Sequence, residues 1–236
     1  MYKTLLFDLD GTLLDVDMRV FLKEYFIKLG EHLEHVIPPE TLVKHLKSST
    51  QVMIDNLDPD KTNKQVFCED FLKKVNIPAG KMKPLLEDFY QNKFKTLKPF
   101  ARQLPMAREV METASRLGCC LVLATNPVFP YLAIKHRLEW SGLEEFPYKL
   151  ITSYENMHFC KPNLHYFQEI LEKAGSQPHQ CLMIGNDMDD DMVASKAGIK
   201  TFLVEDFLID RNRRGYHVDY QGTLKDLALF LQEQEL

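Results

Sequence analysis

Two aspartates separated by one leucine follow the first strongly apolar segment of the chain, in the order Asp8-Leu9-Asp10-Gly11-Thr12. Because side chains alternate along an extended segment, Asp8 and Asp10 are expected on one side and Leu9 on the other. Two carboxylates this close repel one another unless a cation or a shared proton compensates. The spacing is typical of a nucleophilic carboxylate beside an acid/base carboxylate, with a hard cation between them. The alternative is a charged turn that only closes a strand.

A second acidic segment holds four aspartates within five positions, namely Asp187, Asp189, Asp190 and Asp191. Carboxylate oxygens are hard ligands, so the cluster suits Mg²⁺ better than a soft metal. Acidic side chains also complement the first turn of a helix, which is our interpretation of Asp189 and Asp190. An EF-hand does not fit, because Met192 stands where that loop requires glycine.

Two further polar groups lie near predicted strand ends or turns. Thr125 and Asn126 follow the apolar segment 119–124 and lead into a predicted helix, where a hydroxyl and an amide can donate to a phosphate oxygen. Lys161 precedes Pro162, a residue that favours the first turn of a helix. Taken singly, each is also ordinary turn or surface chemistry.

The elements that must position these residues alternate between short apolar segments and helical patterns. The apolar segments have the composition of strands buried on both faces: 4–7, 119–124, 149–151, 181–184 and 201–204. The helical patterns each end at a glycine: 108–117, 163–174 and 189–197. This alternation predicts an α/β fold with a doubly wound, mostly parallel sheet. Ligands of such sheets bind at the carboxyl ends of the strands.

Residues 16–96 break this alternation, because they contain only amphipathic helical periodicity. The first predicted helix has its apolar positions at Val20, Tyr25, Ile27 and Leu29. Two later helices are expected around 67–75 and 85–90. The pattern predicts a helical module inserted after the first strand, with 1–15 and 97–236 forming the α/β core.

Composition narrows the class of protein. The hydrophobic share of 45% and charged share of 27% are those of a soluble globular chain. The longest apolar run is about six residues, against the ~20 that a membrane helix needs. A net charge of −5 gives no electrostatic footprint for nucleic acid. We therefore expect a cytoplasmic monomer or small homo-oligomer without a membrane or nucleic-acid partner.

Two other features are expected to have no catalytic role. The basic run 211–214 is flanked by acidic residues and is typical of a solvated loop. The five cysteines lack C-x-x-C spacing, which argues against a disulfide scaffold or a structural zinc site. Cys160 is expected to be a buried thiol rather than a functional one.

The order of these motifs resembles the haloacid dehalogenase superfamily over nearly the full chain. The resemblance rests on Asp-x-Asp-Gly-Thr at 8–12, Thr-Asn at 125–126, Lys-Pro at 161–162 and the acidic loop at 187–191. Residues 16–96 resemble the type 1 cap of this family, which closes over the active site and selects the substrate. The resemblance implies a Mg²⁺-dependent phosphomonoesterase whose partner is a small phosphorylated substrate.

The resemblance also implies a role for each matching residue. Asp8 attacks the phosphorus to form an aspartyl-phosphate, and Asp10 protonates the leaving alcohol and then activates water. Thr125 and Lys161 hold the phosphoryl oxygens, with Asn126 beside them. Mg²⁺ is held by the Asp8 carboxylate, the Asp10 backbone carbonyl and the acidic loop. These roles agree with phosphoryl transfer being mostly positioning and electrostatic stabilisation.

One departure from the family pattern lies in the acidic loop. Asn186 occupies the position where relatives commonly carry the first acid, and Asp187 follows it. We predict Asp187 as the metal ligand with Asn186 as a neutral oxygen ligand, and Asp191 as the residue that orients Lys161 or a metal-bound water. A phosphomutase of the same superfamily and a catalytically weakened binding or scaffold homologue are the alternatives. Asn186 is the feature that favours the weakened homologue.

Overall fold

The computed structural model describes residues 2–211 and 215–233. Its centre is a six-stranded sheet in the order β5-β4-β1-β6-β7-β8, with every neighbouring pair parallel. The strands are β1 Thr4–Phe7, β4 Cys120–Leu123, β5 Tyr148–Ile151, β6 Cys181–Gly185, β7 Lys200–Val204 and β8 Tyr220–Gly222. The chain winds outward from β1 to β4 and β5, then returns to β6 on the other side. The predicted doubly wound parallel sheet is confirmed.

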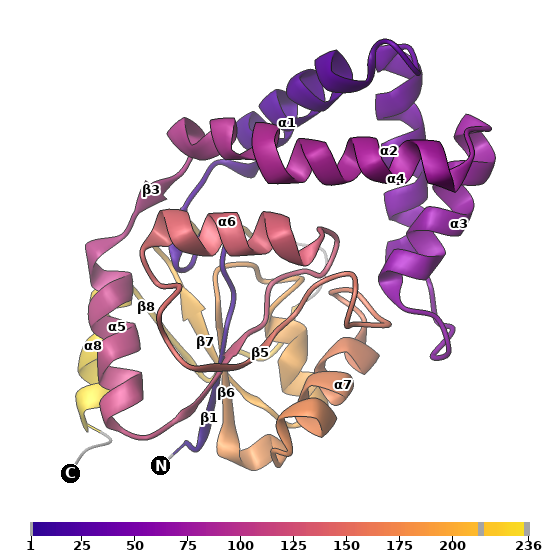
Figure 1. The fold of residues 1–236 in the computed structure, drawn as a ribbon. Helices are drawn as coiled ribbons and strands as arrows, with labels where there is room; N and C mark the ends of the chain where they lie inside the picture. Colours follow the sequence, from indigo (N-terminus) through magenta and orange to yellow (C-terminus); the bar gives the residue numbers. More distant parts are fainter. Residues whose placement is uncertain (1, 212–214, 234–236) are drawn as a thin grey trace.

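Helices cover both faces of this sheet (Figure 1). They are α5 Pro105–Arg116, α6 Tyr131–Ser141, α7 Leu164–Ala174, the 3₁₀ helix η4 Met192–Ala197 and α8 Leu224–Gln232. The alternation along β1 divides the core, because Leu5 and Phe7 pack with residues of α5 and α8. Leu6 points the other way and packs with Tyr166 and Phe167 of α7. Burial on both faces explains why these strands are continuous apolar runs rather than alternating ones.

The helix expected at 189–197 does not form over its first turn. The Asp187 side chain instead accepts hydrogen bonds from the amides of Asp189 (2.9 Å) and Asp190 (3.1 Å), and Asp191 accepts one from the amide of Asp187 (3.0 Å). Aspartates that bind neighbouring amides compete with helical hydrogen bonding. The regular structure therefore begins only at Met192, as a 3₁₀ helix.

A helical insertion separates β1 from β4, as predicted. It consists of α1 Met18–Leu33, α2 Pro39–Ile54, α3 Asn63–Val75, α4 Ala79–Asp88, the π-helix η1 Phe89–Lys93 and the 3₁₀ helix η2 Phe94–Phe100. Two short antiparallel strands, β2 Leu14–Asp15 and β3 Arg102–Gln103, join its entry and exit. Figure 1 shows the insertion beyond the end of the sheet opposite the N terminus.

The buried face of α1 differs from the prediction. Val20 and Ile27 are 45% and 43% exposed, whereas Phe21, Tyr25 and Leu29 are buried. The buried residues are spaced by four, so they form one stripe of the helix, and Val20 and Ile27 lie outside it. Helix α2 was not predicted, because the polar Ser49 interrupts its buried stripe of Leu42, Leu46 and Met53.

Aromatic packing joins the insertion to the sheet. Phe94 stacks on Trp140 of α6 with ring centroids 5.7 Å apart, and Tyr25 meets Phe129 edge to face at 5.5 Å. These rings belong to the same apolar cluster as the β1 residues. The insertion is therefore packed firmly onto the core at this edge. None of the helices in the described ranges is long and apolar enough to cross a bilayer.

Candidate active site

Three motifs meet where the central strands end. Asp8 and Asn186 directly follow β1 and β6, and Thr125 is the second residue after β4. These three strands are adjacent and parallel. The amide of Asp8 still donates to Ile184 O of β6 at 2.9 Å, so the nucleophile candidate is held by the sheet itself. Gly11 then adopts a φ of +87°, which turns the chain away from the strand. This is the edge at which α/β sheets bind their ligands.

A buried ammonium joins two of the predicted residues. Lys161 Nζ donates to Asp8 Oδ1 at 2.8 Å and to Asp191 Oδ1 at 2.6 Å, and the Lys161 and Asp191 side chains are each 1% exposed. Asp191 reaches this position because residue 185 is glycine. A Cβ there would lie 2.2 Å from Asp191 Oδ2. Burial lowers the pKa of Lys161, but the charges of Asp191 and Asp8 outweigh it and raise that pKa well above its usual value.

Asp10 has a different cationic partner. Arg137 of α6 donates from Nη1 to Asp10 Oδ2, and its guanidinium lies over the Phe129 ring, 4.7 Å from the centroid. The arginine side chain is 1% exposed. The second oxygen, Asp10 Oδ1, is buried and has no hydrogen-bond partner among the described residues. Burial raises the pKa of Asp10, the charge of Arg137 opposes that rise, and the charge of Asp8 adds to it.

Arg137 was not among the predicted site residues. Sequence alone offers one signal for it, an arginine between Ile134 and Leu138 on the buried side of a helix. A buried arginine requires an anionic partner, because an unpaired charge is costly to desolvate. Nothing in the local pattern says that the partner is Asp10, which lies 127 positions earlier in the chain.

Arg211, which was predicted to have no role at the site, contacts the acidic loop. Arg211 Nη1 lies 2.8 Å and 2.7 Å from the two carboxylate oxygens of Asp187, and 3.8 Å from Asp189 Oδ2. Arg211 is exposed, as expected for a solvated loop, but its ion pair with Asp187 was not predicted; 212–214 lie outside the described residues. Both Asp189 oxygens are buried without a hydrogen-bond partner in the described part of the chain.

Asn186 connects the loops around this site. Its Oδ1 accepts a hydrogen bond from Thr12 Oγ1 at 3.2 Å, and its Nδ2 donates to Phe207 O at 2.6 Å. Its backbone carbonyl accepts from Ile209 N at 2.8 Å. The segment 207–211 is thereby fixed against the acidic loop, which explains why Arg211 reaches Asp187.

The predicted phosphate-binding residues lie beside Lys161. Thr125 is 3% exposed, and its carbonyl accepts a hydrogen bond from Thr152 Oγ1 at 2.7 Å. Asn126 Nδ2 donates to Lys161 O at 3.5 Å, and Asn126 Oδ1 is a further buried oxygen without a hydrogen-bond partner within the described ranges. The expected helix does not begin at Asn126. Helix α6 starts at Tyr131, because the prolines at 127 and 130 disfavour a helical conformation in the residues that precede them.

Cys160, next to the buried lysine, is fully buried. Burial raises the pKa of its thiol far above the ordinary value, so it stays protonated and unreactive. The structure therefore agrees with its interpretation as a core residue.

The charges at this edge fit a hard divalent cation. Six aspartates gather here: Asp8, Asp10, Asp187, Asp189, Asp190 and Asp191. Three cationic side chains pair with them: Arg137, Lys161 and Arg211. The acidic side chains outnumber the cationic ones by three, and carboxylate oxygens are the donors that Mg²⁺ prefers. No cluster of three or more His, Cys, Asp or Glu side chains in the described residues is already arranged around a metal position.

The site opens into a hollow of about 530 Å³. The core supplies one wall, which includes Asn126, Lys161 and Arg211. The insertion supplies the other through the end of α2, with Gln51, Ile54 and Asp55. These α2 residues were not predicted, because periodicity does not distinguish a helix face that lines a site from one that packs.

Comparison with known proteins decides the family. A family model described as haloacid dehalogenase-like hydrolase matches residues 5–204. The chain belongs to this family. The predicted family, fold class and phosphatase-type enzyme are thereby confirmed, since phosphatase relatives match most of its length.

Several relatives of this haloacid dehalogenase-like hydrolase have assigned activities. This chain is 27% identical over 199 residues to a phosphoglycolate phosphatase of Agrobacterium fabrum, and the match covers 82% of this chain and 76% of that one. It is 23% identical over 219 residues to the pyrophosphatase PpaX of Oceanobacillus iheyensis, covering 92% and 91%. A glyceraldehyde 3-phosphate phosphatase of Methanothermobacter thermautotrophicus is 29% identical over 151 residues, but the match spans only 61% of this chain and 62% of that relative.

Solved structures share the fold. A HAD phosphatase from Thermococcus onnurineus superposes with a TM-score of 0.58 at 22% identity, covering 97% of each chain. An L-2-haloacid dehalogenase from Xanthobacter autotrophicus gives the same TM-score at 13% identity, covering 98% of this chain and 99% of that one. Because phosphatases and dehalogenases match equally well in shape, the fold does not choose the reaction.

Proposed function

We propose that this protein is a Mg²⁺-dependent phosphomonoester hydrolase that acts on a small phosphorylated metabolite through an aspartyl-phosphate on Asp8. The observation that carries the proposal is the separate pairing of two neighbouring carboxylates, Asp8 with Lys161 and Asp10 with Arg137. A nucleophile and an acid/base catalyst need different protonation behaviour, which different partners provide. Dehalogenation does not need the second carboxylate, whereas a phosphate ester needs its leaving alcohol protonated.

In the first step, an Asp8 carboxylate oxygen attacks the phosphorus, and the bond between phosphorus and the ester oxygen breaks. Asp10 donates its proton to the departing alcohol, leaving a phosphoryl group on Asp8. Burial raises the pKa of Asp10, which favours the protonated acid that this step consumes. Arg137 occupies one oxygen of Asp10, so the unpartnered Oδ1 is the atom that serves the substrate.

In the second step, the ionised Asp10 takes a proton from water as that water attacks the phosphorus. The bond to Asp8 breaks, phosphate leaves and Asp10 is protonated again. Lys161 holds a phosphoryl oxygen together with Thr125 and Asn126, as the family pattern implies. Asp191 acts as the residue that orients Lys161, through the 2.6 Å contact between them.

We assign the metal to the Asp8 carboxylate, the Asp10 backbone carbonyl and Asp187. Phosphatases of this family generally depend on Mg²⁺, and the ion supplies charge neutralisation for the phosphoryl oxygens. Asn186 is assigned a supporting role, because its carbonyl oxygen already accepts from Thr12. Arg211 holds in place the Asp187 carboxylate, which would be a ligand of the ion.

The proposed function is tested by phosphate release from a panel of phosphomonoesters, with Mg²⁺ and with EDTA. We expect release that EDTA abolishes and Mg²⁺ restores. Asp8→Asn is the blank, and we expect its rate to fall by at least ~10³-fold while its circular dichroism is unchanged. Full activity in EDTA would remove the metal from the mechanism, and full activity of Asp8→Asn would remove the nucleophile. Interconversion of sugar phosphates without phosphate release would establish the phosphomutase instead.

We further propose that residues 16–96 act as the substrate-selecting cap. Support comes from α2, whose last turn forms a wall of the catalytic hollow.

A further inference from the structure

A second, apolar hollow adjoins the catalytic one. It has a volume of about 370 Å³ and lies between α1, α2 and the loop that precedes α6. Its walls are mainly aromatic and aliphatic, and include Leu22, Tyr25, Leu46, Phe67, Phe129 and Tyr154. A concave apolar site with a few polar groups at its edge is the usual form of a small-molecule site.

The apolar hollow and the catalytic hollow are lined by neighbouring residues of two segments. Gln51 of α2 lines both of them. In the loop before α6, Asn126 lines the catalytic hollow, and Val128 and Phe129 line the apolar one. Phe129 also lies under Arg137, the partner of Asp10. One residue, Phe129, thus lines the apolar hollow and contacts the arginine that holds Asp10.

The lining of the apolar hollow is almost entirely uncharged. At the junction, Asp55 is an exposed carboxylate whose Oδ1 accepts a hydrogen bond from Gln51 Nε2 at 2.9 Å. Among the described residues that line the apolar hollow, Lys47 is the only charged one. Its ammonium lies 5.2 Å from the centre of the Phe26 ring. Apart from this one ammonium, a leaving group in the apolar hollow meets aromatic and aliphatic side chains, which favour an uncharged body.

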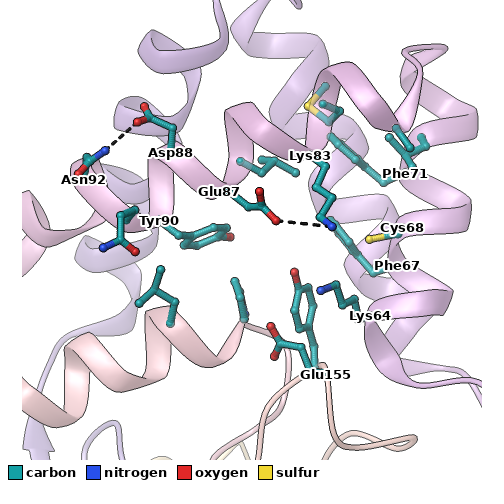
Figure 2. Close-up of a pocket in the computed structure, with 18 residues that line it drawn as sticks. Lys64, Phe67, Cys68, Phe71, Lys83, Glu87, Asp88, Tyr90, Asn92 and Glu155 are labelled. Atoms are coloured by element: carbon teal, nitrogen blue, oxygen red, sulfur yellow. Dashed lines mark hydrogen bonds and ion pairs between the residues drawn. The ribbon is translucent and has the colours of Figure 1, made fainter.

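A larger cavity extends the available space. It has a volume of about 720 Å³ and lies between α3, α4 and the core (Figure 2). It contains none of the proposed catalytic residues, but it shares Phe67, Tyr90, Pro130 and Tyr154 with the apolar hollow. Figure 2 shows Lys83 paired with Glu87, and the side chains of Lys64 and Glu155 lower in the same view. The space next to the apolar hollow is therefore bounded by rings and has a charged rim.

The geometry points to a substrate class: the phosphate monoester of an uncharged, apolar or aromatic alcohol, whose body lies in the apolar hollow. This inference rests on the proposed phosphatase function and adds the chemistry of its leaving group. It separates this protein from the relatives named for phosphoglycolate and for pyrophosphate, whose leaving groups are anionic.

Two esters of similar intrinsic reactivity test the inference, namely 2-phenylethyl phosphate and phosphoglycolate. Both release an alkyl alcohol, so their difference reports recognition rather than leaving-group chemistry. We expect kcat/KM to be about 10-fold or more higher for 2-phenylethyl phosphate. Replacing Thr50, which lines the apolar hollow, by tryptophan (Thr50→Trp) fills it. We expect this variant to lose about 10-fold in kcat/KM for 2-phenylethyl phosphate, chiefly through KM.

Two controls keep the test specific. Val52→Trp adds the same bulk to an exposed position of α2 that lines neither hollow, and we expect it to behave as the parent protein. Acetyl phosphate, whose leaving group is too small to need the apolar hollow, should be cleaved by Thr50→Trp within about twofold of the parent rate. This also reports that the variant is folded.

The outcomes separate the inference from the function on which it rests. A preference for phosphoglycolate, or 2-phenylethyl phosphate kinetics that Thr50→Trp leaves unchanged, would overturn the substrate class while the phosphatase stands. A large loss for 2-phenylethyl phosphate with Lys47→Met would also overturn it, because an ammonium would then be the main recognition element. If no phosphoester or acetyl phosphate gives Asp8-dependent release, the proposed function itself fails.

Discussion

The carboxyl edge of the sheet and the helical insertion build their parts of the site in opposite ways. At the sheet edge, charged side chains are fixed in pairs: Lys161 by Asp8 and Asp191, and Asp10 by Arg137. The insertion offers apolar surface instead, with rings and aliphatic groups around the hollow beside the site. Reaction chemistry therefore depends on a few exact charge positions. Under the proposed function, we expect substrate choice to depend on the volume and polarity of the apolar surface that the insertion supplies.

This contrast also explains how the two regions tolerate change. Removing one partner of a buried ion pair lowers the free energy of unfolding much more than a modest change in the shape of an apolar wall does. We expect substitutions at the sheet edge to affect stability and turnover together. Substitutions in the insertion that line the apolar hollow should mainly affect KM.

The largest effect is expected for Lys161→Met. The variant leaves Asp8 and Asp191 buried without their shared cation, which destabilises the fold by about 3–5 kcal/mol. Phosphate release should fall by at least ~10³-fold, because the phosphoryl oxygens lose their fixed charge. Urea unfolding followed by circular dichroism measures the first, and a phosphate assay at a temperature where the variant is folded measures the second. A variant of parental stability would show that the ion network contributes nothing to folding.

A smaller and more selective effect is expected for Arg137→Lys. Lysine keeps the charge but not the planar guanidinium that lies on Phe129, so Asp10 loses its fixed orientation. Phosphorylation by alkyl phosphates, which needs the Asp10 proton, should slow by about 10²-fold. Phosphorylation by p-nitrophenyl phosphate should slow far less, because its leaving group departs without protonation.

Rapid-mixing kinetics with p-nitrophenyl phosphate distinguish a specific loss of Asp10 proton transfer from a general loss of active-site structure. Arg137→Lys should release a burst of p-nitrophenolate followed by slow turnover, since the water step still needs Asp10. An equal loss in the first step for both kinds of ester would show that Arg137 has no role specific to Asp10.

The smallest effect is expected for Asp55→Asn. Removing this exposed charge at the junction of the hollows should raise kcat/KM for phosphoglycolate by about two- to fivefold, at low ionic strength and less at high salt. The value for 2-phenylethyl phosphate should not change. Glu40→Gln, which removes an exposed carboxylate at the other end of α2, is the matched control. A similar gain in both variants would mean that net charge, and not position, is responsible.

The same contrast separates what sequence could and could not predict. Strands buried on both faces are continuous apolar runs, so β1, β4 and β6 could be located, and with them the edge where Asp8 and Thr125 lie. The helices of the insertion were harder to predict. The polar Ser49 interrupts the buried apolar stripe of α2, and the exposed Val20 and Ile27 led to a wrong prediction of the buried face of α1.

Ion pairs between residues far apart in the sequence could not be predicted either. Arg137 and Arg211 reach Asp10 and Asp187 only through α6 and the segment that Asn186 holds in place. Neither contact leaves a local pattern. The prediction of a helix from residue 189 was wrong, because the Asp187 side chain accepts hydrogen bonds from neighbouring backbone amides and no helical turn forms there.

The central claim is that Asp8 becomes covalently phosphorylated and that Asp10 acts on it. The most direct test uses Asp10→Asn, in which the water step lacks its base. The protein is mixed with Mg²⁺ and p-nitrophenyl phosphate, quenched in acid, digested and examined by mass spectrometry. We predict one phosphoryl group on the peptide that contains Asp8, sensitive to hydroxylamine and missing from a parallel Asp8→Asn sample. Phosphate release by Asp10→Asn at the parental rate, or a phosphoryl group on any other residue, would contradict the mechanism.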